Sequence, residues 1–120
     1  MPPDVDAAPI TISEAVREAA GIVDPSDRYA PVGELERWFE DHDEPANTVP
    51  DLDRRLAGAV DEIDPDGDEP ALAVAAAVAL YLASLPRHAP REPEGVVDQA
   101  LQLWFGDDVP EPVAAWLDAG

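Results

Sequence analysis

The sequence predicts an all-α fold, a single domain of five to six helices packed around a central apolar helix at about residues 70–85. This stretch carries no charge, is rich in alanine and leucine, and is followed by Pro86. Such a run favours a helix over a strand, and a helix that is apolar on every side is typically buried. The flanking segments repeat apolar residues at spacings of three and four, which is typical of amphipathic helices.

The chain is long enough for one domain with one hydrophobic core. Residues 1–10 contain three prolines and two aspartates, with little periodicity. This composition predicts a flexible N-terminal tail, so that residues 11–120 are expected to form the domain. The sequence shows no internal repeat and no pattern that predicts a strand.

The first helix is expected to begin after Thr11, because Thr11 and Glu14 form a T-x-x-E capping box. It should end near Ala20, since Gly21 suits the position after a helix C-terminus. The sequence Asp-Pro-Ser-Asp at residues 24–27 then predicts a turn.

Two further helices are expected before the central one. The second should run from Pro31, which suits a first helical position, to about Asp41. The third should start near Pro50 and end near Ile63. Gly58 weakens this helix relative to alanine, so we expect it to mark a close crossing with another helix.

The central helix divides into two faces when its residues are placed at about 100° intervals. Its bulky face, which should point into the core, comprises Val74, Val78, Tyr81, Leu82 and Leu85. The opposite face is mostly alanine, with Ala73, Ala76, Ala79 and Ala83. Either another helix of the same chain covers this alanine face, which we favour, or a second copy does. The chain is therefore expected to be a monomer or a homodimer.

The C-terminal part predicts two more helices. The fifth runs from about Glu94 to Phe105, with Gly106 as its stop. A short sixth helix carries the apolar residues Val113, Trp116 and Leu117.

Negative charge dominates the composition. The chain has 27 acidic residues and 7 arginines, with no lysine, which gives a net charge of −20. Such a surface repels nucleic acid and anionic membranes, so direct binding to either is not expected. The acidity has three possible explanations: the habit of a high-salt, high-GC host, an acidic face for a basic partner, or cation binding. Under the first, stability should rise with salt through screening.

The residue inventory excludes several chemistries. Without cysteine there are no disulfides, no thiolate nucleophiles and no cysteine-ligated zinc. Without lysine there is no Schiff base, and no phosphate-binding glycine loop is present. We therefore expect no enzyme activity and no cofactor. The N-terminus lacks a secretory pattern and the central run is shorter than the ~20 residues that cross a bilayer, so a cytoplasmic location is expected.

The acidic loop at residues 64–69 does not fit an EF-hand calcium site. When Gly67 is aligned with the loop glycine, Ala73 falls where a bidentate glutamate is needed. Pro65 also stiffens the segment that would wrap the ion. A solvated turn between two helices is expected instead.

Three features are candidates for binding a partner. The first is an acidic run at a predicted helix C-terminus, formed by Glu40, Asp41, His42, Asp43 and Glu44. The helix dipole makes negative charge unfavourable there, so the run is either a solvated helix end or a face for a basic partner. A metal site at His42 is a weaker possibility.

The second feature is the only locally basic patch, formed by Arg87, His88 and Arg91 after the central helix. These residues either stabilise the helix C-terminus or contact a carboxylate or phosphate. The third is Trp116. Tryptophans at helical spacing are expected to pack in the core; if one is exposed as an interface anchor, Trp116 near the C-terminus is the candidate.

These observations favour a small acidic, non-catalytic interaction protein, such as an accessory subunit or adaptor, that binds a protein partner through acidic helix faces. The alternative is an acidic inhibitor of a basic partner, either an immunity-type protein or a nucleic acid mimic. A small metal-dependent protein or enzyme is the third hypothesis.

Overall fold

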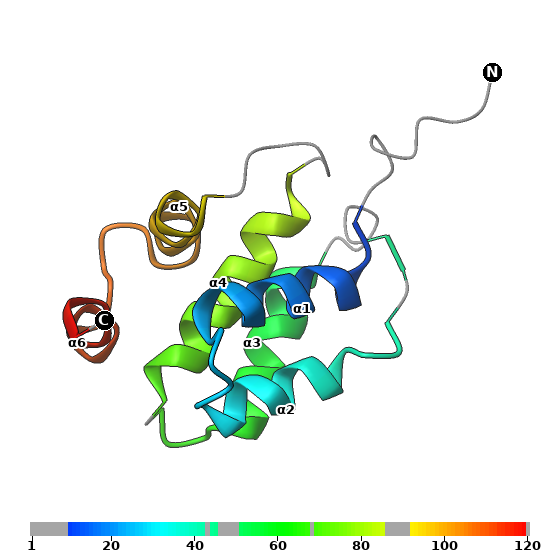
Figure 1. Ribbon diagram of the computed structural model, residues 1–120, viewed down its shortest axis with the longest axis horizontal. Helices are drawn as coiled ribbons and strands as arrows, with labels where there is room; N and C mark the ends of the chain where they lie inside the picture. Colours follow the sequence, from blue (N-terminus) through cyan, green and yellow to red (C-terminus); the bar gives the residue numbers. More distant parts are fainter. Residues whose placement is uncertain (1–9, 43, 46–50, 68, 86–91, 120) are drawn as a thin grey trace.

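The computed structural model describes residues 10–42, 44–45, 51–67, 69–85 and 92–119. These ranges contain six helices (Figure 1): α1 (Ile12–Val23), α2 (Ala30–Trp38), α3 (Leu52–Ile63), α4 (Pro70–Ala83), α5 (Pro93–Phe105) and α6 (Glu111–Ala119). They contain no strand, only an isolated antiparallel bridge between Thr11 and Pro45. The buried side chains form one cluster. The predicted all-α, single-globule fold is confirmed.

One residue of the predicted N-terminal tail lies within the described ranges. Ile10, its last residue, is only 4% exposed and belongs to the core. The other nine residues of that prediction lie outside the described ranges.

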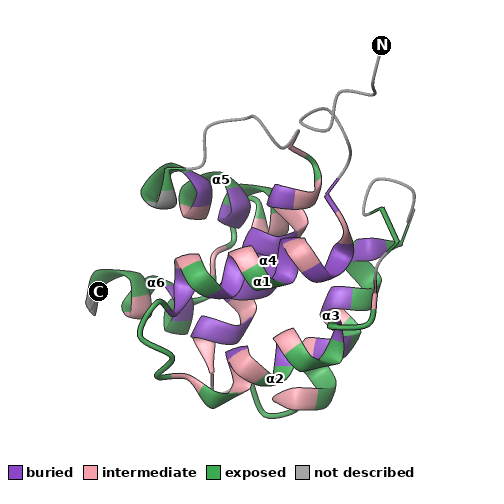
Figure 2. Ribbon diagram, turned by 45° about the vertical axis from the view of Figure 1, so that its right-hand side comes forward, coloured by how far each residue is buried: buried purple, intermediate pink, exposed green. Residues whose placement is uncertain are grey.

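Helix α4 lies in the middle of the molecule and contacts each of the other five helices (Figure 1). Nine of its 14 residues are buried, and they occur on both of its faces (Figure 2). Because α4 has no charged side chain, every neighbouring helix can place its apolar face against it.

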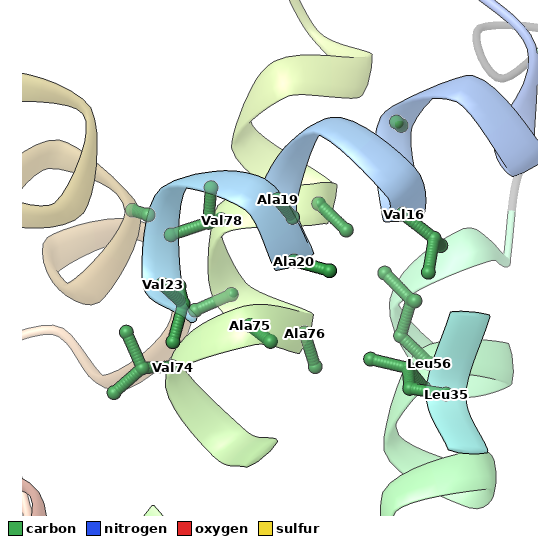
Figure 3. Close-up of a cluster of buried hydrophobic side chains, with 14 of the residues drawn as sticks. Val16, Ala19, Ala20, Val23, Leu35, Leu56, Val74, Ala75, Ala76 and Val78 are labelled. Atoms are coloured by element: carbon green, nitrogen blue, oxygen red, sulfur yellow. The ribbon is translucent and has the colours of Figure 1, made fainter. Parts of the chain in front are cut away.

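Part of the alanine face of α4 is covered within the chain. Helix α1 crosses α4 where Ala19 and Ala20 meet Ala75 and Ala76 (Figure 3). All four side chains are buried, and small side chains allow the two helix axes to approach closely. Of the predicted alanine face, Ala76 and Ala79 are buried, while Ala73 and Ala83 are half-buried.

Two turns of the fold repeat each other, although the sequence predicts no repeat. Helices α1 and α3 both end at an aspartate, Asp24 or Asp64, whose backbone N–H donates at 2.8 Å to the carbonyl four residues earlier. The dihedrals of the two aspartates nearly coincide, with φ −134° and ψ 65° against φ −136° and ψ 72°. A proline follows each aspartate, so neither helix can continue.

The third residue after each aspartate has a positive φ, 55° at Asp27 and 69° at Gly67. The aspartate carboxylate then accepts a backbone N–H bond at 2.9 Å, from Tyr29 in one turn and Glu69 in the other. Those two residues are the N-caps of the following helices. The fold therefore contains two helical hairpins, α1–α2 and α3–α4, joined by the same type of turn.

Three predictions of local structure are wrong. Helix α1 continues past Ala20 and through the exposed Gly21 to Val23, because Asp24 and the following proline provide the stop. Helix α2 ends at Trp38, three residues before the predicted Asp41. Gly58 marks no close crossing, since no atom lies within 4 Å of the position that a Cβ would occupy there.

Among the described helices, none combines the length and the apolar character that a membrane crossing requires.

Candidate partner-binding groove

A groove of about 670 Å³ lies between the C-terminal end of α1, the turn that follows it, and helices α5 and α6. We call this hollow the α5–α6 groove. Its apolar lining comes from all of these elements and includes Ile22, Tyr29, Val97, Leu101, Trp116 and Leu117. Leu117 is 36% exposed, so an apolar side chain of a partner can reach the floor from solvent.

One hydrogen bond ties α6 to the rest of this groove. The indole Nε1 of Trp116 donates to the hydroxyl oxygen of Tyr29 at 3.1 Å. The two rings also pack edge to face, with centroids 6.2 Å apart and an interplanar angle of 64°. Tyr29 is itself fixed, because its backbone N–H donates to the Asp24 carboxylate. The Asp24 turn therefore positions an aromatic pair at the groove wall.

The rim of the groove is mainly acidic. Glu94 and Asp98 are exposed and four residues apart on α5, so they lie on the same side of that helix. Asp24 also lines the groove, but its carboxylate accepts the backbone N–H bonds of Arg28 and Tyr29. Arg28 is the one basic lining residue. The groove thus presents an apolar floor beneath a net negative rim.

Trp116 is a groove residue, but it is not the exposed tryptophan. The sequence named Trp116 as the candidate if one tryptophan were exposed, and the structure shows it half-buried and packed against the core. The exposed tryptophan is Trp38, at 46%. Tyr29, 87 residues away in sequence, packs edge to face against the Trp116 ring.

The acidic run after α2 has a structural explanation that the sequence did not reveal. The backbone carbonyls of His42 and Glu44 accept hydrogen bonds from Ser13 and Ile12 at 3.0 and 3.1 Å. These donors are the first two residues of α1, whose N-terminus favours nearby negative charge. The run therefore follows the C-terminus of α2 and lies beside the N-terminus of α1. The favourable interaction with the α1 dipole offsets the unfavourable one with the α2 dipole.

Three acidic side chains of the run lie within the described ranges. Glu40, Asp41 and Glu44 are exposed. Glu44 lies 3.5 Å from Arg55, which is also 3.5 Å from Asp51. These exposed pairs are worth little individually. The four remaining predicted site residues, Asp43, Arg87, His88 and Arg91, lie outside the described ranges.

His42 lies in a second groove, of about 440 Å³, between α2 and α3. Its ring packs edge to face on Phe39, with centroids 5.1 Å apart. Glu62 lines the same groove, so a histidine and a carboxylate do share one hollow. However, the Nδ1 atom of His42 is buried and has no hydrogen-bond partner among the described residues. That nitrogen is inaccessible to a bound substrate in this arrangement.

Within the described ranges, no three histidine, aspartate or glutamate side chains are grouped closely enough to hold one metal ion. Asp64 of the acidic loop instead uses its carboxylate to accept the backbone N–H of Glu69.

Sequence reasoning found Trp116 but missed the partners that make its groove. Tyr29 and Asp98 carry no motif, and the groove arises only where α5 and α6 meet the end of α1. The acid pair on α5 and the Asp-Pro turn are the two sequence features that point toward it.

Comparison with protein-family models, with curated proteins and with solved structures finds no match to this chain.

Proposed function

We propose that this chain is a non-catalytic interaction protein whose α5–α6 groove binds a basic amphipathic helix of a protein partner. One observation carries the proposal: an apolar floor with Trp116 and Leu117 lies beneath a rim with Glu94 and Asp98. A helix with apolar residues at spacings of three and four would place them on this floor. Lysine or arginine residues beside them would then meet the acidic rim.

The chemistry of the groove suits an interface. Tryptophan and tyrosine dominate binding energy at protein surfaces, because they bury large areas and keep a polar handle. Trp116 and Tyr29 are held by each other before binding, so less side-chain freedom is lost when a partner arrives. The net charge of −20 adds long-range attraction for a basic segment, which raises the association rate.

The arrangement of the acidic residues gives less support to a nucleic acid mimic. Such a mimic needs carboxylates along one continuous face. Exposed or half-buried acids instead occur on all the described helices except α4, and in the turns between them. An inhibitor of a basic partner fits the same groove and differs from an adaptor only in what its binding does to that partner.

The coverage of α4 supports a self-contained monomer. Helix α1 occupies the alanine face that a second copy would otherwise meet. The groove is then free for a different protein, and we propose a one-to-one complex.

Binding of a designed peptide tests the groove. The probe is a synthetic helix of about 18 residues with leucines at spacings of three and four and lysines between them. We expect saturable binding by fluorescence anisotropy, with an affinity that falls as salt is added. Trp116→Ala or Leu117→Gln should weaken binding about tenfold, which corresponds to about 1.4 kcal/mol.

The chain offers a matched control for these variants. Leu103 is 54% exposed on α5 but does not line the groove, so Leu103→Gln should leave binding unchanged. The double variant Glu94→Gln/Asp98→Asn should weaken binding and flatten its salt dependence. Equal losses from Leu103→Gln and Leu117→Gln would mean that the peptide adheres nonspecifically, and the proposal would be wrong.

A further inference from the structure

The described surface contains a second groove with the opposite chemistry to the α5–α6 groove. This Trp38 groove, between α2 and α3, has a volume of about 440 Å³ and includes Trp38, His42, Arg54, Arg55, Gly58 and Glu62 in its lining. From its geometry we infer that it binds an acidic segment of a protein partner, one that presents an apolar side chain next to a carboxylate. This inference rests on observations independent of the function proposed above.

The apolar part of the site is Trp38. Its exposed fraction of 46% is high for so large an apolar side chain at the end of a helix whose other bulky residues are buried. Gly58 faces the groove without a side chain, and no atom lies within 4 Å of where its Cβ would be. The absence of that side chain leaves open space beside α3. An incoming aromatic or aliphatic side chain can pack there against the Trp38 ring.

The charge of the site selects an anion. Arg54 has no ion pair within the described residues, in a chain with 27 acids and 7 arginines. Arg55 is already held by Glu44 and Asp51, which leaves Arg54 as the available guanidinium. A guanidinium pairs with a carboxylate through two parallel N–H bonds. The lining itself holds two arginines and one acid, Glu62, so its own formal charge is positive on a strongly negative protein.

A peptide suits this groove better than a small molecule or a nucleic acid. Small-molecule sites enclose most of the ligand surface, whereas the Trp38 groove is open and the Trp38 side chain is about half exposed. A nucleic acid would bring many phosphates against a chain of net charge −20, while an acidic peptide brings a few carboxylates. Helix α4 lies between this groove and α5 and α6 (Figure 1), so both grooves can be occupied together.

Two synthetic peptides of equal length test the inference, one alternating glutamate with phenylalanine and one alternating glutamine with phenylalanine. Anisotropy is measured at about 1 M salt, where a Debye length of about 3 Å screens the net repulsion but not a contact pair. We expect the glutamate peptide to bind and the glutamine peptide to bind at least about tenfold more weakly. Trp38→Ala and Arg54→Gln should each raise Kd about tenfold.

Three controls make the result specific. Glu62→Gln should tighten binding, because it removes the one opposing charge. Arg28→Gln, in the other groove, and Trp116→Ala should leave Kd unchanged. Circular dichroism shows whether each variant keeps its helices. The inference is overturned if the glutamate peptide does not bind or if both peptides bind equally. It is also overturned if Arg54→Gln has no effect on Kd, or if a single-stranded oligonucleotide binds the groove more tightly than the glutamate peptide does.

Discussion

Trp116 and Tyr29 are joined by a 3.1 Å hydrogen bond from the indole nitrogen to the phenolic oxygen, across 87 residues of sequence. This bond connects the last helix to the turn after the first one. Helix α6 has only nine residues, too few to be stable in isolation. Its position therefore depends on contacts of this kind and on its packing against α4.

Tyr29→Phe removes the acceptor and keeps the aromatic ring. We expect a loss of about 1 kcal/mol in the free energy of unfolding, measured by urea denaturation. The indole N–H would then face only solvent, so Trp116 fluorescence should also shift. Val109→Ala, a half-buried change in the α5–α6 connection that leaves this bond intact, separates the effect of the bond from general loosening. A Tyr29→Phe variant as stable as the parent would show that packing alone holds α6.

The Asp24 carboxylate is expected to be a main determinant of the first turn. It is 8% exposed and accepts the backbone N–H bonds of Arg28 and Tyr29 at 2.8 and 2.9 Å. Asp24→Ala leaves both donors without this acceptor, so it should cost about 1.5–3 kcal/mol in chemical denaturation. Ser26→Ala, an exposed change in the same turn, should cost less than about 0.5 kcal/mol. Similar losses for both variants would contradict this role.

The global fold could be predicted from the sequence because apolar periodicity depends on local spacing. The uncharged stretch that became α4 and the five amphipathic segments around it all formed helices. The helix ends were less predictable. Gly21 suggested a stop, but the two apolar residues after it pack in or against the core and extend α1 to Val23.

The candidate site could be predicted only in part, because it depends on long-range contacts. Trp116 was named from its position near the C-terminus, but its hydrogen bond to Tyr29 could not be read from the sequence. The acidic run after α2 suggested an unfavourable helix end, since the sequence does not reveal that its carbonyls meet the first turn of α1. Pairings between distant segments, such as Thr11 with Pro45, leave no local pattern.

Gly58→Ala tests whether the glycine in α3 has a structural role. The residue is exposed inside a helix, and a methyl group there meets no atom within 4 Å. Alanine should therefore stabilise the protein by about 0.5–1 kcal/mol, because glycine loses more backbone entropy on folding. Gly21→Ala in α1 is the matched control, with the same open surroundings, and should give a similar gain in thermal denaturation. A loss at Gly58 alone would show a constraint that the open space does not explain.

Ala76→Leu tests the crossing of α1 and α4. Ala76 is fully buried at the point where the two helices meet, so three added carbons must displace a neighbouring helix. Overpacking of this kind typically costs about 1–3 kcal/mol. The measurement is urea denaturation, combined with size-exclusion chromatography to detect any change in oligomeric state. Ala114→Leu, at an exposed position of α6, is the control and should change stability by less than about 0.5 kcal/mol. If Ala76→Leu were equally harmless, the alanine face could not be closely packed against α1, and a second copy would again be a candidate to cover it.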